Sequence, residues 1–200
     1  MRLLRFVLGV ALAVGTPLAH AGAQKYEPLA NNVRSALSRA VADRGVAQLR
    51  FSAPQHGYQW LAEMSDRLAR RIADDKFRVE LLKAVHYEAT RAGLDPQLVL
   101  GIIEVESSFN KYAVSSAGAR GLMQVMPFWF ALIGGKDQNL FHLRTNLRFG
   151  CTILRHYLDI ENGDLFRALG RYNGSLGRAE YPTLVLSAWR SKFHYSGRIG

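Results

Sequence analysis

Apolar residues recur at helical spacing along most of this 200-residue chain beyond residue 21. Helix-period runs cover residues 31–50, 58–76 and 77–91, and short stretches containing glycine or proline separate them. A period-two alternation followed by a hairpin turn, the pattern typical of strands, occurs over no length of the chain. The pattern therefore predicts an all-α protein.

The clearest single element is a helix that begins at Asp95-Pro96. Aspartate is a favoured N-cap residue, and proline suits the first helical position. We expect this helix to run to about Phe109, with Asn110 as the left-handed residue that ends it.

Glu106 lies in the middle of the apolar stripe of this helix. At about 100° of rotation per residue, Val99, Ile102 and Ile103 fall on its side, whereas Glu104 points the opposite way. A carboxyl group on a core-facing stripe is costly unless it is neutral, paired or lining a cleft. Burial raises the pKa of a carboxyl group, as a general acid requires near neutral pH. The position thus favours either a general acid or a structural acid paired with a basic residue of another helix.

The segment that follows the helix is rich in small and flexible residues, above all over residues 115–121. Glycine in a turn lets the backbone approach a ligand closely. The amide of Gln124 and the aromatic rings of residues 128–130 are groups that a sugar pocket uses, for hydroxyl groups and for ring faces. We expect this segment to line a binding site beside Glu106.

Three sequence blocks follow one another in a fixed order. Glu-Ser-Ser-Phe stands at 106–109, Ser-x-x-Gly-x-x-Gly-Leu-Met-Gln-x-Met-Pro spans 115–127, and Tyr172-Asn173 comes later. Together they resemble the soluble lytic transglycosylases (SLT domain) of bacterial cell-wall metabolism, a family with the lysozyme-like fold. The resemblance covers roughly residues 78–186, and it departs from the family after Asn173, where Gly174-Ser175 replaces the usual Ala-Gly.

The resemblance implies a division of the chain and a set of site residues. Residues 78–200 would form a lysozyme-like catalytic domain, and residues 22–77 an N-terminal helical extension of unknown role. Glu106 would be the sole catalytic acid and base. The residues implied to bind substrate around it are Ser115, Gln124, Met126, Tyr172 and Asn173.

The implied reaction is cleavage of the β-1,4 bond between N-acetylmuramic acid and N-acetylglucosamine. It consumes no water and leaves a 1,6-anhydro ring on the muramyl residue. No cofactor is implied, and the histidines lack the paired spacing of a zinc-binding helix, so we expect no metal. A hydrolytic lysozyme of the same fold and a non-catalytic wall-binding or assembly protein remain as alternatives.

The first 21 residues have the pattern of a secretory signal peptide. Arg2 and Arg5 precede a short apolar run, and Ala19 and Ala21 stand at the two small-residue positions of a cleavage site. The run falls short of the roughly 20 apolar residues needed to span a bilayer. We predict cleavage after Ala21, a periplasmic location and no stable membrane anchor.

The net charge narrows the choice of partner. The chain carries +10, and the predicted mature chain, which lacks Arg2 and Arg5, carries +8. Such a charge favours an anionic partner. Because an exported protein does not meet nucleic acid as its main partner, we expect peptidoglycan glycan strands; the sequence leaves protein partners unknown. The single cysteine, Cys151, excludes a disulfide scaffold.

Overall fold

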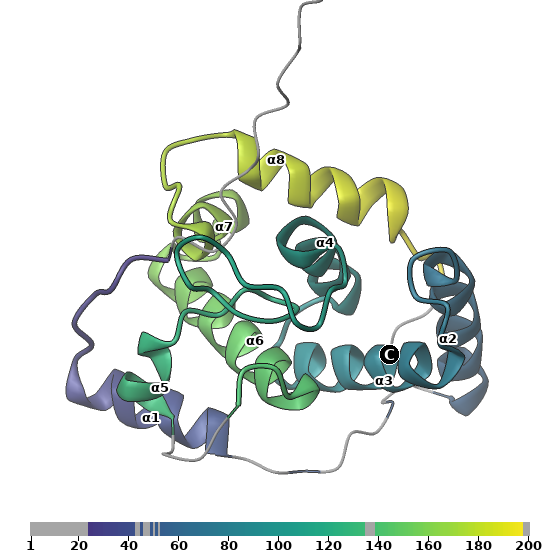
Figure 1. The fold of residues 1–200 in the computed structure, drawn as a ribbon, viewed down its shortest axis with the longest axis horizontal. Coiled ribbons are helices and arrows are strands. Elements are labelled where there is room, and N and C mark those ends of the chain that lie inside the picture. The colour runs from purple at the N-terminus through teal and green to yellow at the C-terminus, as the bar shows by residue number, and fades with distance from the viewer. Residues whose placement is uncertain are drawn as a thin grey trace, which may run out of the picture.

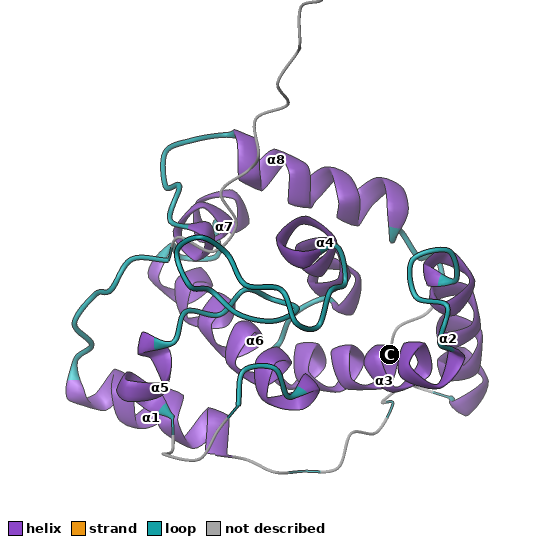
Figure 2. Cartoon of the chain, viewed as in Figure 1, coloured by secondary structure: helices purple, strands orange, loops and turns teal. Residues whose placement is uncertain are grey.

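The computed structural model describes residues 24–42, 45, 49, 51, 53–134 and 139–197. The predicted signal peptide, residues 1–21, lies outside them. Across this part of the chain the regular structure is helical, apart from two isolated β-bridges (Figure 2), which confirms the predicted all-α class. The helices are α1 (Asn31–Ala42), α2 (Pro54–Leu68), α3 (Asp75–Arg91), α4 (Pro96–Ser107), α5 (Phe128–Ile133), α6 (Leu143–Ile160), α7 (Leu165–Asn173), α8 (Glu180–Ser187) and the π-helix η1 (Ala188–Lys192).

Helix α4 lies at the centre of the molecule, and other helices surround it (Figure 1). It packs against α3, α8 and η1. Val99, Ile102 and Ile103 are fully buried on one side. On another side, a Cβ atom at Gly101 would lie 3.1 Å from the backbone of Val185 and Trp189, so the missing side chain lets α8 and η1 approach closely. Burial on both sides makes α4 a fixed support for the side chains it carries.

The start of α4 agrees with the prediction, and its end does not. The Asp95 side chain accepts a hydrogen bond of 2.7 Å from the backbone N–H of Gln97. At the other end, the left-handed residues are Ser108 (φ 49°) and Phe109 (φ 65°), so the prediction for Asn110 is wrong. The early reversal buries the Phe109 ring against Phe193, at 6.1 Å between ring centroids, and this contact offsets the backbone strain.

The helices before α4 have different bounds from those predicted. The first is Asn31–Ala42, and of the remaining residues of the predicted run, 43–50, the structure describes only 45 and 49, which are not helical. The second begins at Pro54, in the stretch that we expected to separate two helices, because proline occupies its first position. It ends at Leu68. Helix α3 begins at Asp75, and the side chain of its N-cap residue, Asp74, accepts hydrogen bonds from the N–H groups of Lys76 and Phe77.

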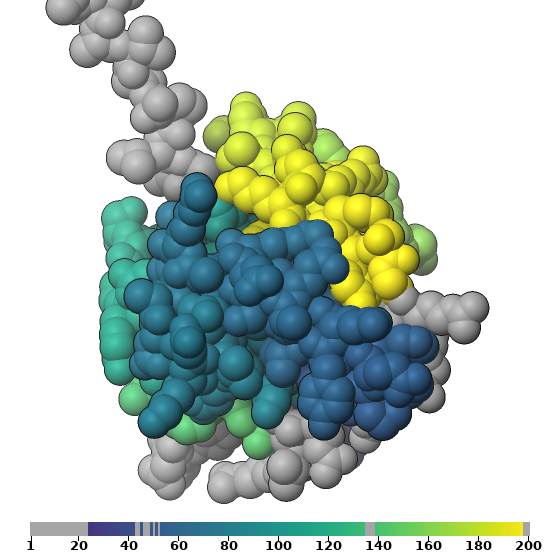
Figure 3. Space-filling view, turned by 90° about the vertical axis from the view of Figure 1, so that its right-hand side faces the viewer, coloured from purple at the N-terminus to yellow at the C-terminus, as the bar shows by residue number. Residues whose placement is uncertain are grey.

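Helix α2 joins the rest of the molecule through the same core and through the C-terminal segment. Its Trp60 and Met64 are fully buried in the hydrophobic cluster that also holds α3 and α4. The Arg67 guanidinium donates to the backbone carbonyls of Lys192 and His194, and Figure 3 shows α2 in blue beside this yellow segment. The region predicted as an extension therefore packs directly on the SLT-like part.

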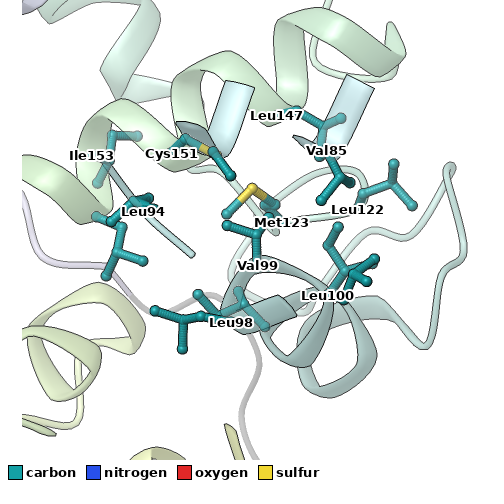
Figure 4. Packing of buried hydrophobic residues seen from close by; sticks show 14 of the residues in the cluster. Val85, Leu94, Leu98, Val99, Leu100, Leu122, Met123, Leu147, Cys151 and Ile153 are labelled. Atoms are coloured by element: carbon teal, nitrogen blue, oxygen red, sulfur yellow. The ribbon is translucent and has the colours of Figure 1, made fainter. Parts of the chain in front are cut away.

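The core beneath the loop after α4 is built around Met123 (Figure 4). Its sulfur lies near Val99 of α4 and Cys151 of α6. A Cβ atom at Gly150 would overlap the Met123 side chain, so the absence of a side chain at Gly150 makes room for it. Cys151 is buried, and burial raises the pKa of its thiol, which suits the core role predicted for it. None of the described helices is long and apolar enough to cross a membrane.

Candidate active site

Glu106 sits in the last turns of α4 and is 5% exposed. The Tyr181 hydroxyl, from α8, donates a hydrogen bond of 2.7 Å to its Oε1 atom. Burial, and next the negative charge of Glu106, raise the pKa of Tyr181 well above its usual value. The phenol therefore stays protonated at any physiological pH and acts as a fixed neutral donor to this carboxyl group.

The loop between α4 and α5 is held in place by three side chains from three helices. The Ser107 hydroxyl of α4 donates to the Leu122 carbonyl at 2.8 Å. Asn146 of α6 accepts from the Met123 N–H at 2.8 Å, and Tyr172 of α7 donates to the Met123 carbonyl at 2.7 Å. Two consecutive backbone units are thereby fixed next to the helix that carries Glu106.

Tyr172 is the deepest of these three anchoring side chains. Its side chain is fully buried. Burial first, and then the charge of Glu106, raise the pKa of its phenol well above the usual value. Tyr172 therefore stays protonated, so its hydroxyl serves as a permanent donor to the loop.

The side chain of Gln124 holds the glycine-rich turn together by hydrogen bonds to its backbone. It is 1% exposed, and its Nε2 atom donates to the carbonyls of Gly121 (2.9 Å) and Ala113 (3.2 Å). Ser115 acts in the same turn, where its hydroxyl accepts from the Ala119 N–H at 3.1 Å. Both side chains therefore shape the loop, and the donors of the Gln124 amide point into the protein.

The remaining predicted residues lie at the edges of this arrangement. Met126 is half-buried at the end of the loop. Asn173 is buried in the last turn of α7, so the Tyr-Asn pair belongs to a helix end rather than to a free turn. Gly174, with φ 82°, caps that helix in the left-handed conformation. The glycine that stands one position earlier than in the family therefore serves as a helix C-cap, where glycine is favoured.

Three residues of the site were not predicted from the sequence. Tyr181 binds Glu106, and Asn146 holds the loop. Gln24, near the start of the described chain, accepts hydrogen bonds from the Trp129 indole N–H (3.0 Å) and the Met126 N–H (3.4 Å). None of them belongs to a recognisable motif, because each reaches the site from a distant part of the chain.

Glu104 confirms the predicted helical phase. Its Oε1 atom accepts from Lys192 at 2.6 Å and from Arg71 at 3.0 Å. The two glutamates of α4 therefore have different partners, two cations for Glu104 and the Tyr181 phenol among those of Glu106. Among the described residues, no group of three or more His, Cys, Asp or Glu side chains is placed to hold a metal ion.

A central helix with a buried glutamate in its last turn, next to a loop that side chains of neighbouring helices hold in place, is typical of a lysozyme-like helical domain. Residues 83–182, half of the chain, match the family described as Transglycosylase SLT domain, and the chain belongs to this family.

Named relatives agree with this assignment. The chain is 54% identical over 112 residues to the membrane-bound lytic murein transglycosylase C of Haemophilus influenzae, covering 48% of this chain and 31% of that protein. It is 39% identical over 113 residues to the transglycosylase of Enterobacteria phage PRD1, covering 53% and 42% respectively. A lytic murein transglycosylase C from Actinobacillus pleuropneumoniae is 58% identical over 48 residues, 24% of this chain and 13% of the relative. The chain thus spans less than half the length of these curated relatives.

Proposed function

We propose that this protein is a peptidoglycan lytic transglycosylase that uses Glu106 as its single general acid and base. The observation that carries the proposal is the geometry of Glu106, which is buried at the end of the central helix and bound by the Tyr181 phenol at 2.7 Å. This glutamate lies within the segment that matches the SLT family. A buried carboxyl group with a neutral donor is suited to both giving and taking a proton.

The proposed reaction has two proton transfers. Protonated Glu106 gives its proton to the oxygen of the β-1,4 bond as the bond from that oxygen to the muramyl C1 breaks. The Glu106 carboxylate then takes the proton of the muramyl 6-hydroxyl, whose oxygen bonds to C1 and closes the 1,6-anhydro ring. Glu106 ends protonated, as it began, and no water is consumed. The Tyr181 phenol stabilises the carboxylate that exists between the two transfers.

The sequence supplies no second acid in the segment that follows Glu106. The sequence contains no acid between Glu106 and Asp137, and Asp137 lies outside the described residues. Glu104 and Glu88 are held in ion pairs with basic side chains. Most glycosidases need two carboxylates. The resemblance implies that the acetamido group of the substrate takes the place of the second one, by stabilising the cationic C1.

The proposed setting is the periplasm, where the protein would act after cleavage behind Ala21. A mature charge of +8 suits a substrate whose peptides carry carboxylates, through long-range attraction that salt weakens. The glycan strand is the proposed partner.

Product analysis tests the proposal. Purified protein is incubated with sacculi in ¹⁸O-labelled water, and the released muropeptides are analysed by mass spectrometry. We expect 1,6-anhydromuramyl ends without the label. Labelled reducing ends would instead establish a hydrolytic muramidase, and retention on sacculi without any release would establish a non-catalytic wall-binding protein.

A further inference from the structure

The first residues that the structure describes lie against the candidate site. Gln24 is only 4% exposed, although it is polar and precedes every described helix. Its Oε1 atom accepts two hydrogen bonds, from the Trp129 indole and from the Met126 backbone. Two N–H donors from the loop and α5 thus converge on one amide carbonyl oxygen.

The neighbouring residues continue this contact along the surface. The ring of Tyr26 meets Phe128 edge to face, at 5.7 Å between centroids. Glu27 pairs with Arg171 of α7 at 3.2 Å. Lys25 and Glu27 also cover a small cavity of about 120 Å³ over α6 and α7. Figure 1 shows this segment, in dark purple, running from α1 towards α7.

Gln24 also lies close to the residues around the catalytic position. Burial and the Glu106 charge raise the pKa of Tyr172, whereas the side chain of Gln24 acts to lower it. The geometry agrees, because the loop whose Met123 carbonyl accepts from Tyr172 also carries Met126, whose N–H donates to Gln24. A simple anchor for the N-terminal region would need the Glu27–Arg171 pair and the Tyr26 ring, but it would not need a carboxamide buried at the site.

We propose that residues 24–28 form an intramolecular strap whose Gln24 carboxamide occupies an amide-binding position of the site, from which a ligand with an amide carbonyl displaces it. The identity of that ligand, the acetamido group of a peptidoglycan sugar, rests on the proposed function. The Met126 and Trp129 N–H groups would pass from the Gln24 carbonyl to the ligand carbonyl. The apparent affinity of a ligand equals its affinity for the open form multiplied by the fraction of molecules in which the strap is open, so a closed strap weakens binding.

Binding of tri-N-acetylchitotriose to the purified protein, measured by calorimetry, tests the strap. We expect Gln24→Ala to lower the Kd by about threefold to tenfold, the range that one or two neutral hydrogen bonds provide. Tyr26→Ala removes a contact of a ring that is 60% exposed, and it should act in the same direction with a smaller effect. Gln59→Ala, on the exposed face of α2, is the matched control and should leave the Kd unchanged.

Hydrogen exchange gives a second readout. The backbone N–H groups of residues 24–27 should exchange faster when chitotriose is bound, because the strap has left its position. Equal or weaker binding by both Gln24→Ala and Tyr26→Ala would overturn the proposal, and so would unchanged exchange in the saturated complex or an absence of binding to every variant.

The outcome is independent of the reaction chemistry. Tighter binding by Gln24→Ala, together with a hydrolytic product from sacculi, would support the strap and refute the lytic mechanism. Anhydro products together with an unchanged Kd would support the lytic mechanism and refute the strap.

Discussion

Helices α3 and α4 each bury a glutamate, and the partners that bind the two carboxyl groups differ in kind: guanidinium groups at one, and a phenol among the partners of the other. Glu88 of α3 is fully buried, and its carboxylate pairs with Arg148 (2.9 Å), Arg91 (3.1 Å) and Arg144 (3.6 Å). Glu106 of α4 accepts from the neutral phenol of Tyr181 at 2.7 Å. A carboxylate among guanidinium groups acts as a fixed charge that joins helices. The Tyr181 phenol instead supplies a donor without charge, and under the proposed function it assists a carboxyl group that gives and takes a proton.

The contrast between Glu88 and Glu106 predicts that the largest change in activity follows substitution of Glu106. Glu106→Gln removes the transferable proton but keeps the shape of the side chain, so muropeptide release should fall by about 10²- to 10⁴-fold. Glu104→Gln, two residues away, should keep most of the activity because Glu104 faces Arg71 and Lys192 instead. Rates of release from sacculi provide the measurement, with circular dichroism as the check on folding. Equal losses in the two variants would show that the helix face has no bearing on the chemistry.

The opposite result is expected for stability. Glu88→Gln leaves three buried or half-buried arginines without their carboxylate, so the free energy of unfolding should fall by about 3–5 kcal/mol. Glu106→Gln should change it by less than about 1 kcal/mol, because the amide oxygen can still accept from Tyr181. Urea denaturation of both variants tests the contrast, and a similar loss in both would remove the distinction between the two glutamates.

The parts of the site that the sequence predicts are those encoded by neighbouring residues. The Asp95-Pro96 helix start and the inward direction of Glu106 follow from local capping and from helical period, and the structure agrees with both. Tyr181 lies 75 residues from Glu106, and Gln24 lies 105 residues from Trp129. Their positions depend on how whole helices pack, and no local pattern records that packing.

The wrong prediction for the end of α4 also comes from packing between distant parts of the chain. The left-handed reversal falls at Ser108 and Phe109, before Asn110, because burial of the Phe109 ring against the distant Phe193 determines where the chain turns. Spacing along the sequence contains no information on that contact.

Helix α3 carries a second buried titratable group, His86, and its protonation makes the stability of the fold depend on pH. Its ring is fully buried, stacks on Phe51 at 4.4 Å between centroids, and lies edge-on to Trp60 at 5.2 Å. Burial lowers the pKa of His86 to about 4. The unfolded chain protonates His86 near pH 6.5, whereas the folded chain does so only near pH 4. The folded state therefore has its full stability above pH 6.5 and loses stability as the pH falls from 6.5 towards 4. The loss amounts to about 3 kcal/mol at most.

The variant His86→Phe should therefore flatten the pH dependence of stability between pH 6.5 and 4. The measurement is the urea midpoint at several pH values, compared with the wild type. His194→Asn, at an exposed position, controls for the loss of a histidine as such. A His86→Phe curve that falls as steeply as that of the wild type would mean that other groups account for the acid sensitivity.

The smallest effect is expected at Tyr181, which tests the neutral partner of Glu106 directly. Tyr181→Phe keeps the buried ring and removes only the hydroxyl that donates to Oε1. The carboxylate that develops during the first proton transfer loses one donor, so kcat should fall by about tenfold. The alkaline limb of the pH–rate profile should also move to higher pH, because the ionised form of the acid has become less stable. Tyr58→Phe, at a residue that is 70% exposed, is the matched control. A fall in kcat with an unmoved alkaline limb would show that Tyr181 only supports packing, and the protonation state of Glu106 would then have to be set by other neighbours.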